Sequence, residues 1–138
     1  MDYEAFTRNM MAELRANKGV VQDGPMAGRP LMILTTTGAK SGEPREAIVT
    51  YTREGDKYVI VASKSGADTN PAWYHNLQAN PVAVVEAGGD KFEARATEAT
   101  GAERDRLYAQ HAEERPEFRD YPNKTTRVIP VFTLDRLN

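Results

Sequence analysis

The stretch LMILTTTGAKSGEPREAIVTY, residues 31–51, decides the fold of this chain. Two apolar runs flank a polar loop that contains two glycines and a proline. Short apolar runs separated by turn-forming residues are typical of antiparallel strands joined by a hairpin. The stretch therefore predicts two neighbouring strands, residues 31–37 and 46–53.

The rest of the sequence continues with short strands and few helices. Further strands are predicted at residues 57–63, 82–86, 91–97 and 128–134, and helices at residues 2–17, 71–79 and 100–114. Glycines and prolines in residues 19–30 predict a linker. Six strands joined mostly by hairpins fit an antiparallel barrel better than a parallel sheet. We therefore expect one domain over residues 1–138, mainly β with some α, whose N-terminal helix precedes a barrel of residues 31–134.

Local signals set the expected ends of several elements. Pro71 suits the first position of the second helix, and Asn70 suits its cap. Thr100 and Glu103 form a capping box at the start of the third helix. Pro130 places the last strand at an edge or a bulge of the sheet.

The composition excludes several classes of protein. The chain has 138 residues and no cysteine, which excludes a disulfide framework, a thiolate metal site and a cysteine nucleophile. A net charge of -2 argues against general nucleic-acid binding. No apolar run approaches the roughly 18 residues of a membrane-spanning helix, and the charged first residues do not resemble a signal peptide. The expected location is cytoplasmic.

Two glycine-containing loops carry cations at the ends of predicted strands. The first presents Lys40, Ser41 and Arg45, and the second presents Ser63 and Lys64 ahead of a helix N-terminus. Close backbone approach, cations and a helix N-terminus are features that hold phosphate groups in proteins. The loops therefore predict an anion site on which both converge, and the alternative is a pair of solvated turns.

Aromatic and histidine residues offer fewer signals. Trp73 either stacks on a flat ligand or anchors its helix to the barrel. Phe118 and Tyr121 lie in a polar connection, where they line a pocket or cover the barrel end. His75 and His111 have no paired carboxylate at metal-ligand spacing and no nucleophile motif beside them. The sequence thus predicts neither a metal site nor a hydrolase.

Three segments in this order resemble the deazaflavin-dependent nitroreductase family. They are residues 31–51, VIVASKSGADTNPAWYHNLQANP at residues 59–81, and FRDYPNKTTRVIPVF at residues 118–132. The ordered combination K-S-G-x-x-R, A-S-K-x-G and P-A-W-Y-H-N-L is specific, and the resemblance covers about residues 28–134. It implies a split β-barrel of the flavin-reductase and pyridoxamine-phosphate-oxidase type. It also implies the cofactor coenzyme F-420, an 8-hydroxy-5-deazaflavin.

The resemblance implies a role for each loop. Lys40, Ser41 and Arg45 would hold the phosphate and acidic tail of the coenzyme. The other cofactor contacts would come from Ile48, Val49, Ala62, Ser63, Lys64, Trp73 and Asn76. Phe118 and Tyr121 would border the substrate. Ser63, Tyr121 or solvent would assist proton delivery.

The implied reaction is hydride transfer from the reduced deazaflavin to a planar, electron-poor, hydrophobic substrate. The expected acceptors are quinones, enones of the furanocoumarin or coumarin-lactone kind, and nitroaromatics. The chain has Ala39 where many family members have arginine. Arg115, Phe118 and Tyr121 stand where the nitroreductase type repeats tyrosine. The substrate pocket is therefore expected to differ from that of the nitroreductase type.

Other interpretations of the same residues stay open at this point. An FMN-dependent oxidoreductase, or a non-catalytic carrier of the deazaflavin, would use the same anion site on the same fold. The N-terminal helix packs on the barrel or covers the substrate pocket with its apolar stripe of Tyr3, Phe6, Met10 and Leu14. Its mixed charges favour packing over a membrane surface. The chain is expected to be a monomer or homodimer, cytoplasmic or peripheral at the membrane, without a nucleic-acid partner.

Overall fold

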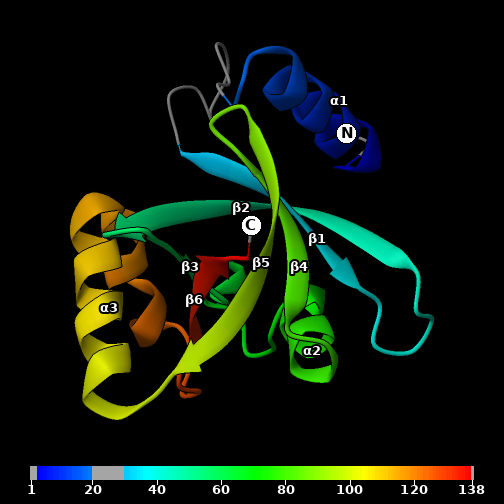
Figure 1. The fold of residues 1–138 in the computed structure, drawn as a ribbon. Helices are drawn as coiled ribbons and strands as arrows, with labels where there is room; N and C mark the ends of the chain where they lie inside the picture. Colours follow the sequence, from blue (N-terminus) through cyan, green and yellow to red (C-terminus); the bar gives the residue numbers. More distant parts are fainter. Residues whose placement is uncertain (1–2, 20–29, 138) are drawn as a thin grey trace.

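The structure, a computed structural model, describes residues 3–19 and 30–137, so the predicted linker falls largely outside it. Within these residues, six antiparallel strands close into a barrel in the spatial order β1-β2-β3-β6-β5-β4 (Figure 1). The strands are β1 Leu31–Thr37, β2 Pro44–Glu54, β3 Lys57–Val61, β4 Val82–Ala87, β5 Asp90–Ala99 and β6 Val131–Arg136. The predicted antiparallel barrel is confirmed.

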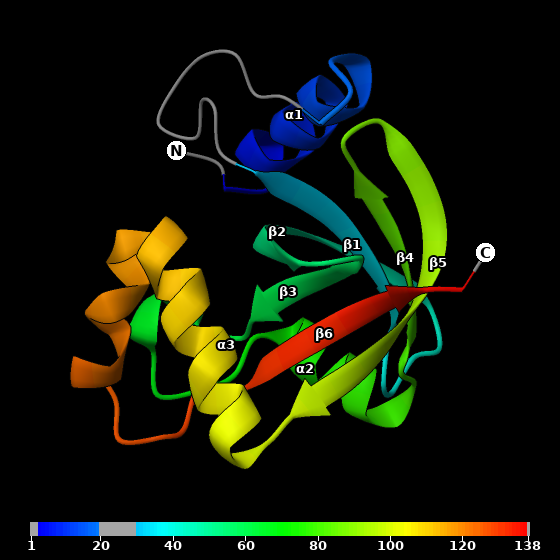
Figure 2. The same cartoon turned by 60° about the vertical axis from the view of Figure 1, so that its left-hand side comes forward.

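Helices lie at both ends of the barrel and along one side (Figure 1, Figure 2). Helix α1 (Tyr3–Ala16) crosses one end, α2 (Ala72–Ala79) lies at the opposite end, and α3 (Gly101–Glu114) packs beside β3 and β6. The connections contain short 3-10 helices, namely η1 (Lys64–Gly66), η2 (Pro116–Arg119) and η3 (Tyr121–Asn123). None of the helices in the described part of the chain has the length and apolar character needed to cross a membrane.

Strands β4 and β5 alternate between buried and more exposed residues, whereas β1, β3 and β6 contain continuous buried runs because helices cover their outer faces. In β5, Phe92, Ala94 and Ala96 are buried and their neighbours are exposed, as the sequence alternation predicted. The inward side chains join one apolar core that also receives Trp73 from α2. Removing this apolar surface from water is the main stabilising contribution to the barrel. Because side chains fill the interior, the space for a ligand lies outside the core.

Helix α3 is held on the barrel by apolar packing and by one buried polar pair. Leu107 packs in a cluster with Val59 of β3. His111 is fully buried, and its Nδ1 lies 2.9 Å from the Thr52 Oγ1 of β2 in a hydrogen bond. Its Nε2 has no hydrogen-bond partner within residues 3–19 and 30–137. Burial, and then the charge of the nearby Arg115, lower the pKa of His111 to about 4.

Helix α1 is docked on β1 by apolar contacts and on two further strands by ion pairs. Met11 and Leu14 pack against the β1 residues in a third buried cluster. The Arg15 guanidinium donates to Glu46 of β2 and, through two bonds of 2.9 Å, to Glu86 of β4. The hydrogen bonds from Arg15 lower the pKa of the Glu86 carboxyl. The prediction that this helix packs on the barrel is therefore confirmed.

The buried stripe of α1 differs in part from its prediction. Leu14 is buried as expected, but the other buried residue is Met11, and Met10 is only partly buried. Phe6 is 37% exposed because it lies at the rim of a pocket instead of in the core. The structure does not describe the Tyr3 side chain.

Several predicted boundaries were wrong. Strand β6 begins at Val131, after Pro130, and the closed barrel gives this strand neighbours on both sides. The predicted edge position therefore does not exist. The N-cap of α2 is Pro71 and not Asn70. Thr100 does occupy the N-cap of α3, but its side chain makes no capping hydrogen bond, so the predicted capping box is absent.

His111 predicts a loss of stability in acid. Its pKa is about 4 in the folded chain, against an ordinary value of 6.5, so the unfolded state binds more protons between these two values. The free energy of unfolding should therefore fall as the pH drops from 6.5 towards 4, by up to about 1.4 kcal/mol per pH unit from this residue. Urea denaturation at about pH 7 and about pH 5 measures the change.

The informative variant is His111→Gln, which keeps a hydrogen-bonding group beside Thr52 but cannot take up a proton. It should lose less stability than the wild type between the two pH values. The exposed His75→Gln is the matched control and should keep the wild-type pH dependence. Equal pH dependence in His111→Gln and the wild type would contradict the prediction.

Candidate functional site

Strand β3 is too short to pair with all of β2, and a pocket lies where the pairing stops. β3 pairs with residues 51–54 of β2, whereas β1 pairs with residues 44–50. Residues 45–50, beyond the end of β3, all line one pocket of about 1380 Å³. The sequence predicted that β3 would run to residue 63. Its earlier end places Ser63–Ser65 in a loop that borders the same pocket.

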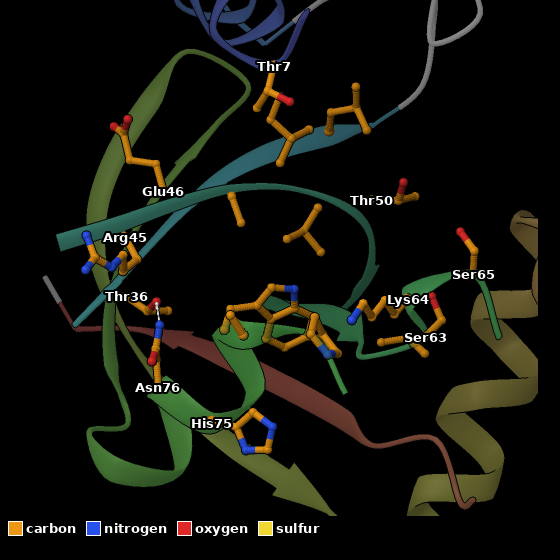
Figure 3. Close-up of a pocket in the computed structure, with 18 of the residues that line it drawn as sticks. Thr7, Thr36, Arg45, Glu46, Thr50, Ser63, Lys64, Ser65, His75 and Asn76 are labelled. Atoms are coloured by element: carbon orange, nitrogen blue, oxygen red, sulfur yellow. Dashed lines mark hydrogen bonds between the residues drawn. The ribbon is translucent and has the colours of Figure 1, made fainter. Parts of the chain in front are cut away.

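The pocket brings together most of the residues that the sequence predicted for a site. Its lining includes Lys40, Ser41, Arg45, Ile48, Val49, Ser63, Lys64, Trp73, Asn76, Phe118 and Tyr121. Ala62 is not part of the lining, because its side chain is fully buried in the barrel core, and its cofactor contact stays a prediction. Arg45 and Lys64 lie on opposite sides of the pocket in Figure 3. The two cation loops therefore face one cavity from two directions.

Internal hydrogen bonds shape the loop between β1 and β2. The Gly38 N–H donates to the Glu43 carbonyl at 2.8 Å. Ser41 Oγ accepts from the Glu43 N–H at 3.1 Å and from Arg45 Nη2 at 3.3 Å. A hydroxyl has two acceptor positions and one proton to donate, so the Ser41 proton can still point to an anion. A Cβ at Gly38 would lie 2.5 Å from Ser41 Oγ, which explains the glycine.

Asn76 ties this loop to α2 and to β1. Its Nδ2 donates to Thr36 Oγ1 at 3.0 Å, the bond drawn in Figure 3. Its Oδ1 accepts from the Ala39 N–H at 2.9 Å. Asn76 is only 7% exposed, so water competes little with either bond. Asn76 therefore holds the loop in place against α2 and β1. Its contact with a cofactor stays a prediction.

Trp73 lies between the barrel core and the pocket. It is buried to 8% exposure, and its ring meets Phe132 of β6 edge-on, with centroids 6.0 Å apart. Edge-to-face pairs at this separation are favourable aromatic contacts. The interpretation that Trp73 anchors α2 is therefore confirmed, and stacking on a flat ligand stays a prediction. The remaining surface of Trp73 faces the pocket.

Phe118 and Tyr121 form an aromatic wall that α3 supports. Phe118 meets His111 edge-on at a centroid distance of 4.4 Å and Tyr121 at 5.0 Å. The Tyr108 hydroxyl donates to the Phe118 carbonyl at 2.6 Å, and burial raises the pKa of Tyr108 to about 12. Arg115, the third position of the predicted spacing, does not line the pocket.

Sequence reasoning missed several residues of the lining. Among them are Thr7 of α1, Thr36 of β1, Thr50 of β2 and Glu117 of η2, whereas Phe6 and Met10 belong to the stripe that the sequence placed on the barrel or over the substrate pocket. The apolar stripe of α1 was the one usable signal, and α1 proves both to pack on the barrel and to border the pocket. Thr50 and Glu117 reach the pocket only through the barrel pairing and α3. Residues 3–19 and 30–137 contain no group of metal-binding side chains.

The sequence matches the model of one protein family. This family, described as "F420H(2)-dependent quinone reductase", matches residues 6–136. A relative from Mycobacterium tuberculosis, named an F420H(2)-dependent quinone reductase, is 41% identical over 110 residues. That alignment covers 78% of this chain and 74% of the relative. The family match runs from α1 to β6, so it includes every element that lines the pocket.

Solved structures give a consistent result. A structure titled F420-H2 dependent reductase is 40% identical, covers 78% of this chain and 95% of its own, and superposes with a TM-score of 0.71. A structure described as a domain-swapped dimer is 34% identical, covers 97% and 98%, and has a TM-score of 0.73. At 11% identity, a pyridoxamine-phosphate-oxidase-type structure from Listeria innocua shares the fold alone, with a TM-score of 0.55.

Asn76 predicts a measurable loss of stability when its side chain is removed. Asn76→Ala leaves the Thr36 hydroxyl and the Ala39 N–H without their buried partner, which should lower the free energy of unfolding by about 1–3 kcal/mol. Gln78→Ala on the same helix is the matched control, because its bond to Glu98 is exposed and should change stability little. Urea denaturation compares the two variants. A loss no larger than that of the control would refute the buried bridge.

Proposed function

The chain belongs to the F420H(2)-dependent quinone reductase family, and from this we propose that it reduces quinones with reduced coenzyme F-420. The resemblance to deazaflavin-dependent enzymes is thereby confirmed, as are the split β-barrel, the oxidoreductase class and the deazaflavin cofactor. The observation that carries the proposal is a single pocket lined by both cation loops, the open part of β2 and an aromatic wall.

The donor set of the pocket fits the coenzyme. Its tail carries phosphate and carboxylate groups, and Lys40, Arg45 and the Ser41 hydroxyl can bind such groups by charge-assisted hydrogen bonds. Its flat ring needs an apolar surface, and Ile48 and Val49 supply one on β2. When bound, the reduced coenzyme supplies the hydride. We infer that these chain residues hold its tail and orient its ring.

Alanine at position 39 shapes the tail site. Ala39 is exposed, and its N–H is already used by Asn76. In the loop between β1 and β2, positive charge therefore comes from Lys40 and Arg45, while Lys64 approaches from the opposite side of the pocket. Tail affinity should accordingly depend strongly on the first two residues.

The other side of the pocket suits a planar, hydrophobic acceptor. Phe118 and Tyr121 offer aromatic surface, and Phe6 and Met10 of α1 add apolar surface. Quinones fit this description first. Enones of the furanocoumarin or coumarin-lactone kind, and nitroaromatics, are further acceptors that we propose on the same shape and polarity.

Two hydroxyl groups are candidates for assisting the proton that completes the reduction. Ser63 and Tyr121 both line the pocket. In the described part of the chain, neither hydroxyl makes a hydrogen bond to another residue, so each can bond to a substrate oxygen. Bonding to that oxygen would stabilise the negative charge that develops as the hydride arrives.

FMN and a non-catalytic carrier role are the alternatives from the sequence. The family assigns coenzyme F-420 as the cofactor and reduction as the activity, and no contact within residues 3–19 and 30–137 favours either alternative. A homodimer is the oligomeric state that the domain-swapped relative supports. Light scattering of the purified chain distinguishes it from a monomer.

The cation assignment predicts a loss of cofactor affinity. Lys40→Ala combined with Arg45→Ala should raise the Kd for coenzyme F-420 by about tenfold or more, because two charge-assisted bonds to the tail are lost. Fluorescence titration measures this Kd, with FMN titrated alongside. Lys57→Ala combined with Arg106→Ala removes the same charge from surface ion pairs outside the pocket and is the matched control. Unchanged affinity in the first double variant would sink the assignment.

The Tyr121 assignment predicts an effect on turnover. Tyr121→Phe keeps the ring of the wall but removes the hydroxyl, so kcat for quinone reduction should fall several-fold while the Kd for coenzyme F-420 changes little. Steady-state oxidation of the reduced coenzyme measures kcat. Tyr58→Phe, outside the pocket, is the control. An unchanged kcat in Tyr121→Phe would remove its role in proton delivery.

A further inference from the structure

Arg127 lies outside the pocket lining, yet its guanidinium bonds entirely to one loop that borders the pocket. Its Nη2 donates to the Ser63 carbonyl at 2.8 Å, and its Nε donates to the Ala67 carbonyl at 2.8 Å. Its Nη1 donates to Asn70 Oδ1 at 2.7 Å. These acceptors stand before and after η1, so the planar guanidinium bridges the two ends of the Ser63–Asn70 loop.

This loop needs such support because its backbone is strained. Lys64 and Ser65 have φ values of 46° and 56°, and Gly66 follows at 83°. Residues with a Cβ rarely adopt this left-handed region, and two in succession are held only when their surroundings fix them. Lys64 is the cation of this loop, and Figure 3 shows its side chain reaching from the loop towards the middle of the pocket.

The loop also packs against the segment that carries Tyr121. A Cβ placed at Gly66 would lie 3.0 Å from the Lys124 side chain and 3.4 Å from the Tyr121 Cα. Arg127 follows this segment closely in the chain. Its bonds therefore join the loop that presents Lys64 to the segment that presents Tyr121.

All the acceptors of Arg127 are neutral. No carboxylate pairs with its guanidinium within residues 3–19 and 30–137, and its side chain is only partly exposed. An arginine that bonds to two carbonyls and an amide uses the fixed geometry of its fork, which the single ammonium of lysine cannot reproduce. This is the arrangement expected of a residue that sets the position of a loop.

We propose that Arg127 is a positioning residue for the cofactor site: it holds the Ser63–Asn70 loop in the left-handed conformation that directs Lys64 into the pocket. The inference rests on the proposed function, because it assigns Lys64 to the anionic coenzyme. Arg127 itself touches neither cofactor nor substrate. Its effect on binding passes through the conformation of residues 64–66.

The first experiment tests the loop in the full chain without ligand. Hydrogen exchange measured by mass spectrometry should be faster in residues 63–70 of Arg127→Ala and Arg127→Lys than in the wild type. Arg106→Ala, which removes an arginine from a surface ion pair with Glu54, is the control and should leave this loop unchanged. Wild-type exchange in both Arg127 variants would overturn the proposal.

The second experiment tests the link to the cofactor by fluorescence titration with coenzyme F-420. Arg127→Ala should raise Kd about tenfold, the scale of one lost charge-assisted bond, and Arg127→Lys should not restore it. In a Lys64→Ala background, Arg127→Ala should add little, because its effect runs through Lys64. An undiminished effect in that background would overturn the positioning role, and so would full rescue by Arg127→Lys.

A second variant and the ligand-free exchange measurement keep the outcomes distinct. If Arg127→Ala fails to fold, Asn70→Ala removes one of the acceptors and leaves the arginine in place. It should speed exchange in the loop and weaken binding by a smaller factor, and no change in either would overturn the proposal. If the wild-type chain does not bind coenzyme F-420, the proposed function fails. The exchange experiment then still decides whether Arg127 holds the loop.

Discussion

The shortness of β3 is the constraint on which the site depends. β3 pairs only with the second part of β2, and residues 44–50 of β2 have their strand partner on the β1 side alone. At about 3.3 Å per residue, the lining stretch 45–50 spans roughly 17 Å of extended backbone. A flat ring can lie along such a surface, with the proposed tail site at the Arg45 end. The barrel core supports this strand from the other side through Val49.

The two loops around this strand are fixed from outside the pocket. Asn76 bonds to the first loop through Ala39, and Arg127 bonds to the second through Ser63, Ala67 and Asn70. In each case a partly or fully buried side chain uses its polar atoms on the protein. Of the loop cations, Arg45 donates to Ser41 and Lys64 donates to Thr69 at 3.2 Å, so within residues 3–19 and 30–137 neither charge is paired with a carboxylate. Such support reduces the ordering that binding requires, which raises affinity without adding contacts.

The sequence predicted what depends on local pattern. The alternation in β5, the hairpin of residues 31–51 and the helix after Pro71 follow from periodicity and turn chemistry, and they appear in the structure. The polar motif residues of both loops, Lys40, Ser41, Arg45, Ser63 and Lys64, also meet at one pocket. What the sequence could not predict depends on long-range closure. Thr50 borders the pocket because β3 ends short of it, and Glu117 is placed by the packing of η2 against α3. No local signal distinguishes Arg127 from other surface arginines.

The two sides of the pocket have different principal supports, although Arg127 links the second cation loop to the segment that carries Tyr121. The two cation loops are tied to β1, α2 and the 124–130 connection. Phe118, by contrast, contacts His111 and Tyr108 of α3. Helix α1 adds Phe6 and Met10 through its own contacts with β1. Substitutions of Phe6, Met10 or Phe118 can therefore alter the proposed acceptor side without removing a hydrogen bond of either cation loop. Arg15 and His111, by contrast, bond α1 and α3 to β2 itself. The positions where this chain departs from the nitroreductase pattern lie in different parts of the site: Ala39 lies in the first cation loop, Phe118 belongs to the aromatic wall, and Arg115 lies outside the pocket lining.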